Sequence, residues 1–192
     1  CWKDDGLRKR LEFCTELFMD RIYDSSKRHF NLFFDNAWNS LVEMDSYGHD
    51  VEAGWLLCEA ARVLEDRQLM DRANRLALDV TDACLAEGLS DKGYMMYEKK
   101  GGRTTGHASW WGQIETVIAC VNAWQISGSD VYLQSVDTVW TFVKDHMVDK
   151  EYGEWYSDCF DGEPKKEAPK VSMWRCPYHT VRLGVEMYNR LK

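Results

Sequence analysis

Apolar side chains recur every three or four positions in three stretches of the chain, with charged side chains between them. In the first stretch the apolar positions are Leu7, Leu11, Cys14, Phe18 and Ile22. The second stretch covers residues 69–83 and the third covers residues 132–147. This spacing matches the period of an α-helix. It predicts three amphipathic helices, each with one face in water.

Three other stretches are apolar on more than one face. They cover residues 51–64, 110–124 and 178–191. In the last of them the apolar positions include Val181, Val185 and Tyr188. Helices that are apolar nearly all round are the buried ones of a globular protein. We therefore expect these three helices to lie inside the molecule.

Short aromatic runs separate the two kinds of helix. They cover residues 30–35, 93–98 and 153–158 and are typical of strands or extended loops. Two of them begin 60 residues apart, at Gly93 and Gly153. The chain thus repeats one unit three times: an amphipathic helix, an aromatic extended segment, a loop and a buried helix. Such a repeat is the first signal to respect in assigning a fold.

Repeated pairs of one outer and one inner helix predict an all-α toroid of helical hairpins with short β segments between them. A closed toroid needs about six hairpins, so three make about half of one. The 192 residues suit a single domain, residues 1–192. An open half would expose its inner helices, at roughly 25 cal/mol per Å² of apolar area. We therefore expect a missing N-terminal half, or a second copy of the chain, to cover them.

The composition narrows the class of ligand and the compartment. The formal net charge of −8 argues against nucleic acid and anionic membranes and fits a neutral substrate. Nine Trp and nine Tyr suit a large core, and also platforms for the apolar faces of sugar rings. No run of 18 apolar residues occurs, so no membrane-spanning helix is predicted. Seven cysteines without a CxxC pair indicate reduced thiols in a cytoplasmic protein.

Polar residues at the starts of the inner helices are the candidate site residues, because these starts converge at one end of such a toroid. The first cluster runs from Tyr47 to Glu52. His49 and Glu52 are three positions apart and share a helix face, so the carboxylate can orient the imidazole for acid–base work. The alternative is a helix start whose acids complement the dipole, but it leaves His49 unexplained.

The second cluster is the segment from Ser109 to Glu115. Trp110 and Trp111 at a helix start can line a sugar site, and Glu115 can accept hydrogen bonds from hydroxyl groups. The alternative is a helix capped by Ser109, with both tryptophans in the core.

The third cluster runs from Trp174 to His179. Pro177 suits the first turn of a helix, which places His179 near the helix mouth. The alternative is a buried histidine with its hydrogen bonds satisfied. His29, His107 and His146 are interpreted as structural or surface residues. No compact metal-ligand motif and no phosphate-binding loop occurs, so no cofactor and no metal are expected.

Five segments in order along the chain carry a family resemblance. They are Asn31–Trp38, Asp45–Leu57, Trp110–Glu115, Gly153–Trp155 and Trp174–His179. Their order and spacing resemble the motifs of the N-acylglucosamine 2-epimerase superfamily, and they match its cellobiose 2-epimerase branch best. The resemblance implies an (α/α)6 barrel, of which this chain is similar to the C-terminal half.

The same resemblance implies roles for individual residues. His49 and His179 match two acid–base histidines, and Glu52 matches the carboxylate paired with the first. Trp111 and Trp174 match aromatic walls of the sugar site, and Glu115 matches a carboxylate there. Tyr47 and Trp110 are taken as further substrate contacts. The implied reaction interconverts glucose and mannose at the reducing end of a β-1,4-linked disaccharide, through a cis-enediol formed by loss of the C2 proton, without metal or nucleotide.

Other functions remain open on the sequence. An aldose–ketose isomerase or an N-acylglucosamine 2-epimerase of the same superfamily would share the proton abstraction. A glycoside hydrolase would use carboxylates such as Asp50, Glu52 or Glu154, and needs two of them facing each other about 5–9.5 Å apart. A non-catalytic carbohydrate-binding fragment is favoured if the other half of the barrel is absent.

Overall fold

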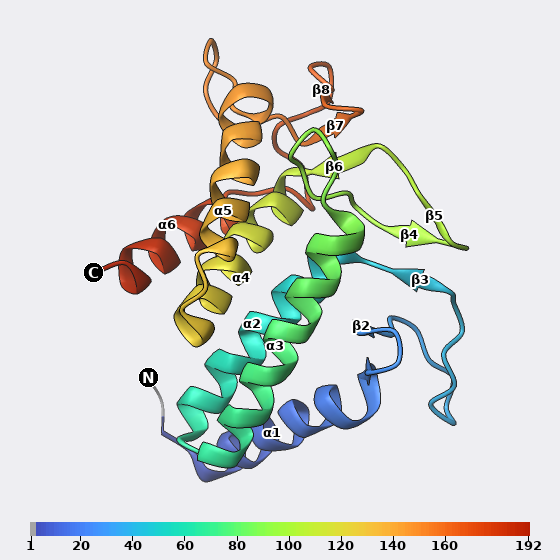
Figure 1. Ribbon diagram of the computed structural model, residues 1–192, viewed down its shortest axis with the longest axis vertical. Helices are drawn as coiled ribbons and strands as arrows, with labels where there is room; N and C mark the ends of the chain where they lie inside the picture. Colours follow the sequence, from blue (N-terminus) through green and yellow to red (C-terminus); the bar gives the residue numbers. More distant parts are fainter. Residues whose placement is uncertain (1–2) are drawn as a thin grey trace.

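The computed structural model describes residues 3–192 as three helical hairpins joined by short β segments (Figure 1). The first hairpin is α1 (Asp5–Leu17) with α2 (Tyr47–Leu64), and the second is α3 (Arg67–Gly88) with α4 (Trp110–Ser127). The third is α5 (Val131–Phe142) with α6 (Tyr178–Arg190). Helices α1 and α5 each continue into a π-helical turn, η1 (Phe18–Ile22) and η2 (Val143–Met147). The predicted three-hairpin organisation is confirmed.

Local signals explain where several helices begin and end. Carboxylates of Asp4 and Asp66 accept hydrogen bonds from backbone N–H groups three residues later, at the starts of α1 and α3. Ser109 caps α4 in the same way, through the backbone N–H of Gly112. Helix α4 ends at Gly128, whose φ of 71° lies in the left-handed region that glycine adopts without strain. The predicted cap at Ser109 is therefore present.

Short antiparallel strands bring the starts of the inner helices together. One pair is β1 (Tyr23–Asp24) with β2 (His29–Phe30). A three-stranded sheet joins β3 (Met44–Asp45), β4 (Lys99–Lys100) and β5 (Arg103–Thr104). Another joins β6 (His107–Ser109), β7 (Asp158–Phe160) and β8 (Glu163–Pro164). Because β3 precedes α2 and β6 precedes α4, the two larger sheets fix the loops at the helix mouths.

The expected extended segments are only partly strands. Two of the aromatic runs reach β2 and β7, but residues 93–98 form no strand and make one bridge, between Met95 and Leu89. Here a side chain supplies the missing hydrogen bonds. Gln113 of α4 accepts from the backbone N–H of Met95 and donates to its carbonyl oxygen.

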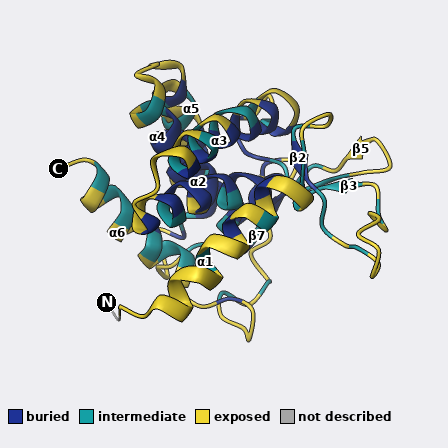
Figure 2. Cartoon of the chain, turned by 90° about the horizontal axis from the view of Figure 1, so that it is seen from below, coloured by how far each residue is buried: buried dark blue, intermediate teal, exposed yellow. Residues whose placement is uncertain are grey.

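Helix α4 lies at the centre of the core and packs against α2, α3, α5 and α6. Every residue from Gly112 to Ala123 is buried, in keeping with its apolar sequence. Figure 2 shows this as dark blue on α4 and on the facing sides of α2 and α3. The inner helices are thus α2, α4 and α6, with α1, α3 and α5 outside them.

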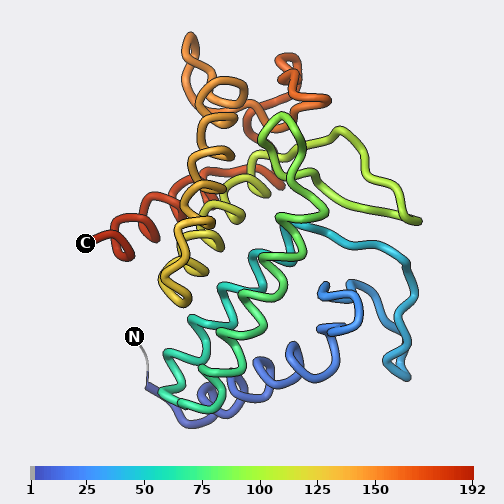
Figure 3. Tube along the Cα trace, in the orientation of Figure 1, coloured from blue at the N-terminus to red at the C-terminus, as the bar shows by residue number. Residues whose placement is uncertain are grey.

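The prediction that the last helix is buried is wrong. In α6 only Leu183 is buried, whereas Val181, Val185 and Tyr188 are 59%, 51% and 70% exposed. Within residues 3–192, the only helix that makes extensive contact with α6 is α4. Helix α1 is similarly open, since Thr15 is its one buried residue. The beginning of α1 and the end of α6 lie on the same side of the molecule (Figure 3).

Two further expectations concern the state of the cysteines and the presence of a membrane-spanning helix. The six cysteines of the described chain are free thiols, four of them buried, and Cys1 lies outside the described residues. Burial raises the pKa of the Cys58 thiol to about 11 and that of Cys120 to about 12. Among the helices of residues 3–192, none has both the length and the apolarity that a membrane crossing requires.

Candidate active site

The mouths of the three inner helices meet around one pocket of about 360 Å³. Six predicted site residues line it: His49, Glu52, Trp110, Trp111, Trp174 and His179. The ring of Trp111 lies between the two imidazoles, with its centroid 4.6 Å from that of His49 and 5.7 Å from that of His179. Residues that are 130 positions apart in the sequence therefore face a common space.

His49 lies in the first turn of α2 and is exposed. Its Nδ1 lies 2.7 Å from Oγ of Ser46, the residue before the helix. The predicted pairing of His49 with Glu52 is wrong, because Glu52 turns toward a cation instead. Its Oε1 accepts a hydrogen bond at 2.5 Å from Nη1 of Arg182, on α6. Both side chains still line the pocket, as their shared helix face predicts.

His179 lies in the first turn of α6 and is held by a buried carboxylate. Its Nδ1 is 2.6 Å from Oε1 of Glu115, whose side chain is 0% exposed. Glu115 also accepts from Nε1 of Trp55 at 2.9 Å and from Nη1 of Arg182 at 3.0 Å. The structure therefore places Glu115 behind His179, and not on the pocket wall where a substrate would meet it.

Tyr47 does not reach the pocket. It is 0% exposed, its ring packs against the place of Gly88 on α3, and its hydroxyl is 3.5 Å from the carbonyl oxygen of Glu87. Two positions separate Tyr47 from His49, so the two side chains leave α2 in different directions. The predicted substrate contact of Tyr47 is contradicted, and the residue belongs to the core.

A buried ion pair links β2 to the first turn of α2. Nδ1 of His29 is 2.7 Å from Oδ2 of Asp50, and the backbone N–H of Phe30 donates to the other oxygen of Asp50. Burial lowers the pKa of His29, but the hydrogen bond and charge of Asp50 raise it more, so the net direction is upward. His29 is thus a structural residue, as the sequence predicts, and Asp50 serves the core.

The segment that carries Trp174 is anchored by a buried arginine that sequence reasoning missed. Arg175 is 3% exposed and donates to the carbonyl oxygens of Trp155 and Lys170. Its guanidinium lies 4.9 Å from the ring centroid of Trp110. Trp174, the next residue, is 85% exposed at the rim of the pocket. The signal was available in the sequence, because an arginine inside an aromatic motif often stacks on a ring.

The pocket also includes Tyr97 and Asp158, which the sequence did not single out, and His107, which was interpreted as a structural or surface residue. Nε2 of His107 is 2.7 Å from Oδ1 of Asp158, across the β6–β7 pair. Burial raises the pKa of Asp158, but its hydrogen bonds with His107 and Ser157, together with nearby positive charge, outweigh this, so the pKa is lowered. His107 precedes an inner helix by three residues, and that position was the available clue.

Among residues 3–192, three groups could hold a metal ion by proximity. One of them lies at the pocket, where ligand atoms of Glu52, Glu115 and His179 are within 4.8 Å of one another. The guanidinium of Arg182 already contacts both carboxylates, so a metal ion would have to displace it. The other two groups share His29, at the buried pair beneath α2.

This fold and this pocket define a class of protein: a half toroid of helical hairpins that presents two imidazoles and several tryptophans to one small cavity. That arrangement suits proton transfer on a small polar molecule with apolar faces. Residues 2–182 match the sequence profile of the family described as N-acylglucosamine 2-epimerase (GlcNAc 2-epimerase). The chain belongs to this family, which confirms the resemblance found in its motifs.

Relatives of known name share both the sequence and the fold. A cellobiose 2-epimerase of Bacteroides fragilis is 40% identical over 191 residues, which are 97% of this chain and 48% of that protein. Among solved structures, a sugar epimerase from a ruminal bacterium superposes with a TM-score of 0.93 at 33% identity, covering 97% of this chain and 48% of that one. The cellobiose 2-epimerase of Bacillus thermoamylovorans superposes with a TM-score of 0.91 at 31% identity, covering 98% and 48%.

The chain therefore spans about half the length of the relatives that it matches. Its three hairpins correspond to half of an (α/α)6 barrel, as the resemblance implied.

Proposed function

We propose that this chain carries half of the active site of a sugar 2-epimerase, in which His49 and His179 move the C2 proton of a reducing-end sugar. One observation supports the proposal above all. The two imidazoles, from α2 and α6, line the same pocket with one tryptophan ring between them. Proton abstraction from one face of a carbon atom and return on the other requires two bases that can reach the same atom.

The proposed reaction uses the side chains as follows. The sugar ring opens, one histidine removes the C2 proton, and the electron pair that remains forms a cis-enediol(ate) with the carbonyl group. Rotation about the C2–C3 bond then presents the other face, and the second histidine returns a proton to C2. Trp110, Trp111 and Trp174 offer flat apolar surfaces to the C–H faces of the sugar.

The proposed substrate is a β-1,4-linked disaccharide such as cellobiose, with glucose and mannose as the interconverting units. The names of the relatives support this choice. A monosaccharide 2-epimerase or an aldose–ketose isomerase would use the same imidazoles and differ in the sugar or in the carbon that receives the proton. A hydrolase is less well supported, because Glu52 and Glu115 are both bound to Arg182 and do not face each other across a free space.

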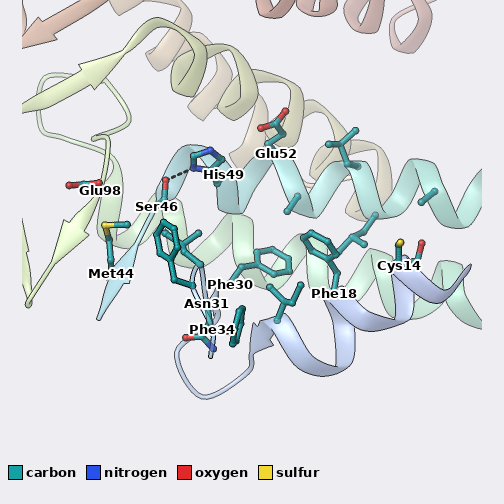
Figure 4. A pocket seen from close by; sticks show the side chains of 18 of the residues that line it. Cys14, Phe18, Phe30, Asn31, Phe34, Met44, Ser46, His49, Glu52 and Glu98 are labelled. Carbon is teal, nitrogen blue, oxygen red and sulfur yellow. Dashed lines mark hydrogen bonds between the residues drawn. The ribbon is translucent and has the colours of Figure 1, made fainter. Parts of the chain in front are cut away.

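We further propose that the pocket is completed by the other half of the barrel. A groove of about 990 Å³ lies beside α2 and is lined by Leu11 and Phe18 from the α1 side, by Phe34, and by Leu56 and Ala60 of α2 (Figure 4). Within residues 3–192, α4 packs extensively against two inner helices, α2 and α6, whereas α2 packs extensively against one, α4. We propose that another inner helix, from the polypeptide that supplies the remaining half, occupies the groove.

The groove and the pocket share part of their lining, namely His49, Glu52 and Tyr97. Figure 4 shows His49 and Glu52 along one side of the groove, above its apolar side chains, with His49 bound to Ser46. A helix in the groove would therefore also form a wall beside His49. For this reason we expect the isolated chain to turn over sugar far more slowly than the completed barrel.

A chimeric protein tests the proposed activity. This chain would replace the part of the Bacteroides fragilis relative that it matches, and the folded product would be incubated with cellobiose in D2O. The expected NMR result is deuterium at C2 of the reducing end together with a new mannose end. A ketose would point to an isomerase and free glucose to a hydrolase. No change in a folded, cellobiose-binding chimera would contradict the proposal and leave a carbohydrate-binding role.

We also propose a cytoplasmic location. The proposal is supported by the six cysteines of residues 3–192, which are all free thiols. Fractionation of the native host, with the chain detected by antibody, is the direct test.

A further inference from the structure

Next to the pocket, the guanidinium of Arg182 joins the three inner helices. Arg182 of α6 donates through Nη1 to Oε1 of Glu52 on α2 at 2.5 Å and to Oε1 of Glu115 on α4 at 3.0 Å. Its guanidinium also lies 4.3 Å from the ring centroid of Tyr178 and 5.5 Å from that of Trp55. The Arg182 side chain is 14% exposed and does not line the pocket. Its effect on chemistry must therefore pass through its neighbours.

Glu115 is the neighbour that matters. Its side chain is 0% exposed, and an ionised carboxylate at such a place needs a cation close by. Arg182 supplies that cation permanently, because a guanidinium does not give up its proton in a protein. Trp55 donates to the other carboxylate oxygen at 2.9 Å. With Arg182 present, Glu115 is an acceptor toward every group around it.

The ionised carboxylate of Glu115 determines which ring nitrogen of His179 carries the proton. Because Glu115 only accepts, the proton of the neutral imidazole must lie on Nδ1, which is 2.6 Å from Oε1 of Glu115. Nε2 then carries the lone pair. Within residues 3–192 Nε2 makes no hydrogen bond, and it is not among the buried unpartnered atoms, so it is accessible from the pocket. Only an unprotonated ring nitrogen can act as a base.

We propose that Arg182 is a positioning residue that fixes the tautomer of His179. By keeping Glu115 ionised, it holds the imidazole proton on Nδ1 and leaves Nε2 as the basic nitrogen toward the pocket. Its second contact draws Glu52 away from His49. The catalytic consequence rests on the proposed function, but the tautomer itself does not.

Removal of the guanidinium should reverse this arrangement. Ligand atoms of Glu52 and Glu115 lie within 4.8 Å of each other, so without Arg182 two carboxylates would share a mostly buried space without a fixed cation. The Glu115–His179 pair would then take up one proton from solvent. With one proton in the hydrogen bond between Nδ1 and Oε1 and the other on Nε2, the pocket would face a hydrogen-bond donor where it had faced a base.

The test is a nitrogen NMR measurement on the chain, with 15N in its histidine rings. For the unaltered chain we expect His179 to show a protonated Nδ1 and an unprotonated Nε2. Arg182→Met keeps the length of the side chain without its charge, and should give a protonated Nε2 or a mixture of tautomers. Arg182→Lys keeps a cation and should restore the original pattern. The matched control is Arg190→Met on the same helix, because Arg190 also joins α6 to α2 and α4, through Glu59 and Asn122, but bonds to neither Glu52 nor Glu115.

An unchanged tautomer in Arg182→Met would overturn the inference. If that variant does not fold, Arg182→Gln replaces it, because an amide can still donate to Glu115 without bringing a charge, and the same shift is expected. In an active chimera, Arg182→Met should lower kcat roughly 100-fold, the lower range for loss of one acid–base group, with little change in KM. The chimera could also show the expected change at His179 in Arg182→Met but no epimerase activity. That result would contradict the proposed function and leave the role of Arg182 intact.

Discussion

The two imidazoles of the pocket are held in different ways. His49 is exposed, and its Nδ1 contacts Ser46, three residues earlier in the same segment. His179 is held by Glu115 of another helix, which is fully buried and contacts Arg182 as well. One imidazole thus depends on the local fold of a helix start, whereas the other depends on the packing of all three inner helices. The difference predicts that a substitution near His179 destabilises the packing of all three inner helices, whereas one near His49 has only a local effect.

The largest expected effect is that of Glu115→Ala, which tests the buried side of this comparison. The change leaves the indole N–H of Trp55 and Nδ1 of His179 without their buried partner, and leaves Arg182 with Glu52 alone. Breaking one partner of a buried ionic group costs about 3–5 kcal/mol in the free energy of unfolding. Urea denaturation followed by circular dichroism measures it. A loss below about 1 kcal/mol would show that the network does not hold the helices together.

Gly48→Ala should act on both imidazoles at once. A Cβ at this position would lie 2.7 Å from two ring atoms of Trp111 and 3.3 Å from the Cα of Gly112. Overpacking of this kind costs about 1–3 kcal/mol, and here it must move the ring that separates His49 from His179. We expect lower thermal stability and a changed tryptophan fluorescence spectrum.

The control for this change is Gly184→Ala, on α6, where an added Cβ meets no heavy atom within 4 Å. Because alanine is the better helix former, that variant should gain about 0.5–1 kcal/mol. Equal behaviour of the two variants would mean that the close approach of α2 to Trp111 is not rigid.

A pH titration tests the buried pair of His29 and Asp50, which lies at the start of the helix that carries His49. The pKa of His29 is raised above 6.5 in the folded chain: burial lowers it, but Asp50, Asp45 and Glu87 raise it more. Protonation of His29 therefore stabilises the fold fully below about pH 6.5, and this stabilisation is lost as the pH rises through the folded pKa. The unaltered chain should therefore lose stability over that range relative to His29→Gln. Parallel stability curves for the two proteins would contradict the shift.

The smallest expected effect is that of Ser46→Ala. It removes one hydrogen bond to an exposed imidazole, worth about 0.5–1.5 kcal/mol at most. We expect urea denaturation to show a far smaller loss than Glu115→Ala gives. Comparable losses in the free energy of unfolding for Ser46→Ala and Glu115→Ala would contradict the view that His49 is held locally and His179 by tertiary packing.

The sequence predicts the features that depend on local periodicity. The three hairpins and the cap at Ser109 follow from helical spacing and capping chemistry, and the repeat brings His49, Trp111 and His179 to the same end of the helices. The same spacing predicts half of a toroid, because three repeated units cannot close one.

The sequence fails where a partner from another element decides the outcome. Spacing places Glu52 beside His49, but Arg182, 130 residues away, attracts the carboxylate. Nothing local distinguishes Tyr47, which is buried, from His49, which is exposed. The apolar pattern of α6 likewise cannot reveal that its outer face has no neighbour within the described chain, as shown by the exposure of Val181 and Tyr188.

The central claim is that two imidazoles serve one carbon atom, and its most direct test is epimerisation by single-histidine variants of the active chimera in D2O. NMR would follow the C2 position and the appearance of the second epimer, starting from each epimer in turn. We expect His49→Ala and His179→Ala each to lower interconversion by about 10²–10⁴-fold with helix content unchanged, whereas His146→Ala on the outer side keeps full activity. Interconversion at the original rate in either pocket variant would contradict the account.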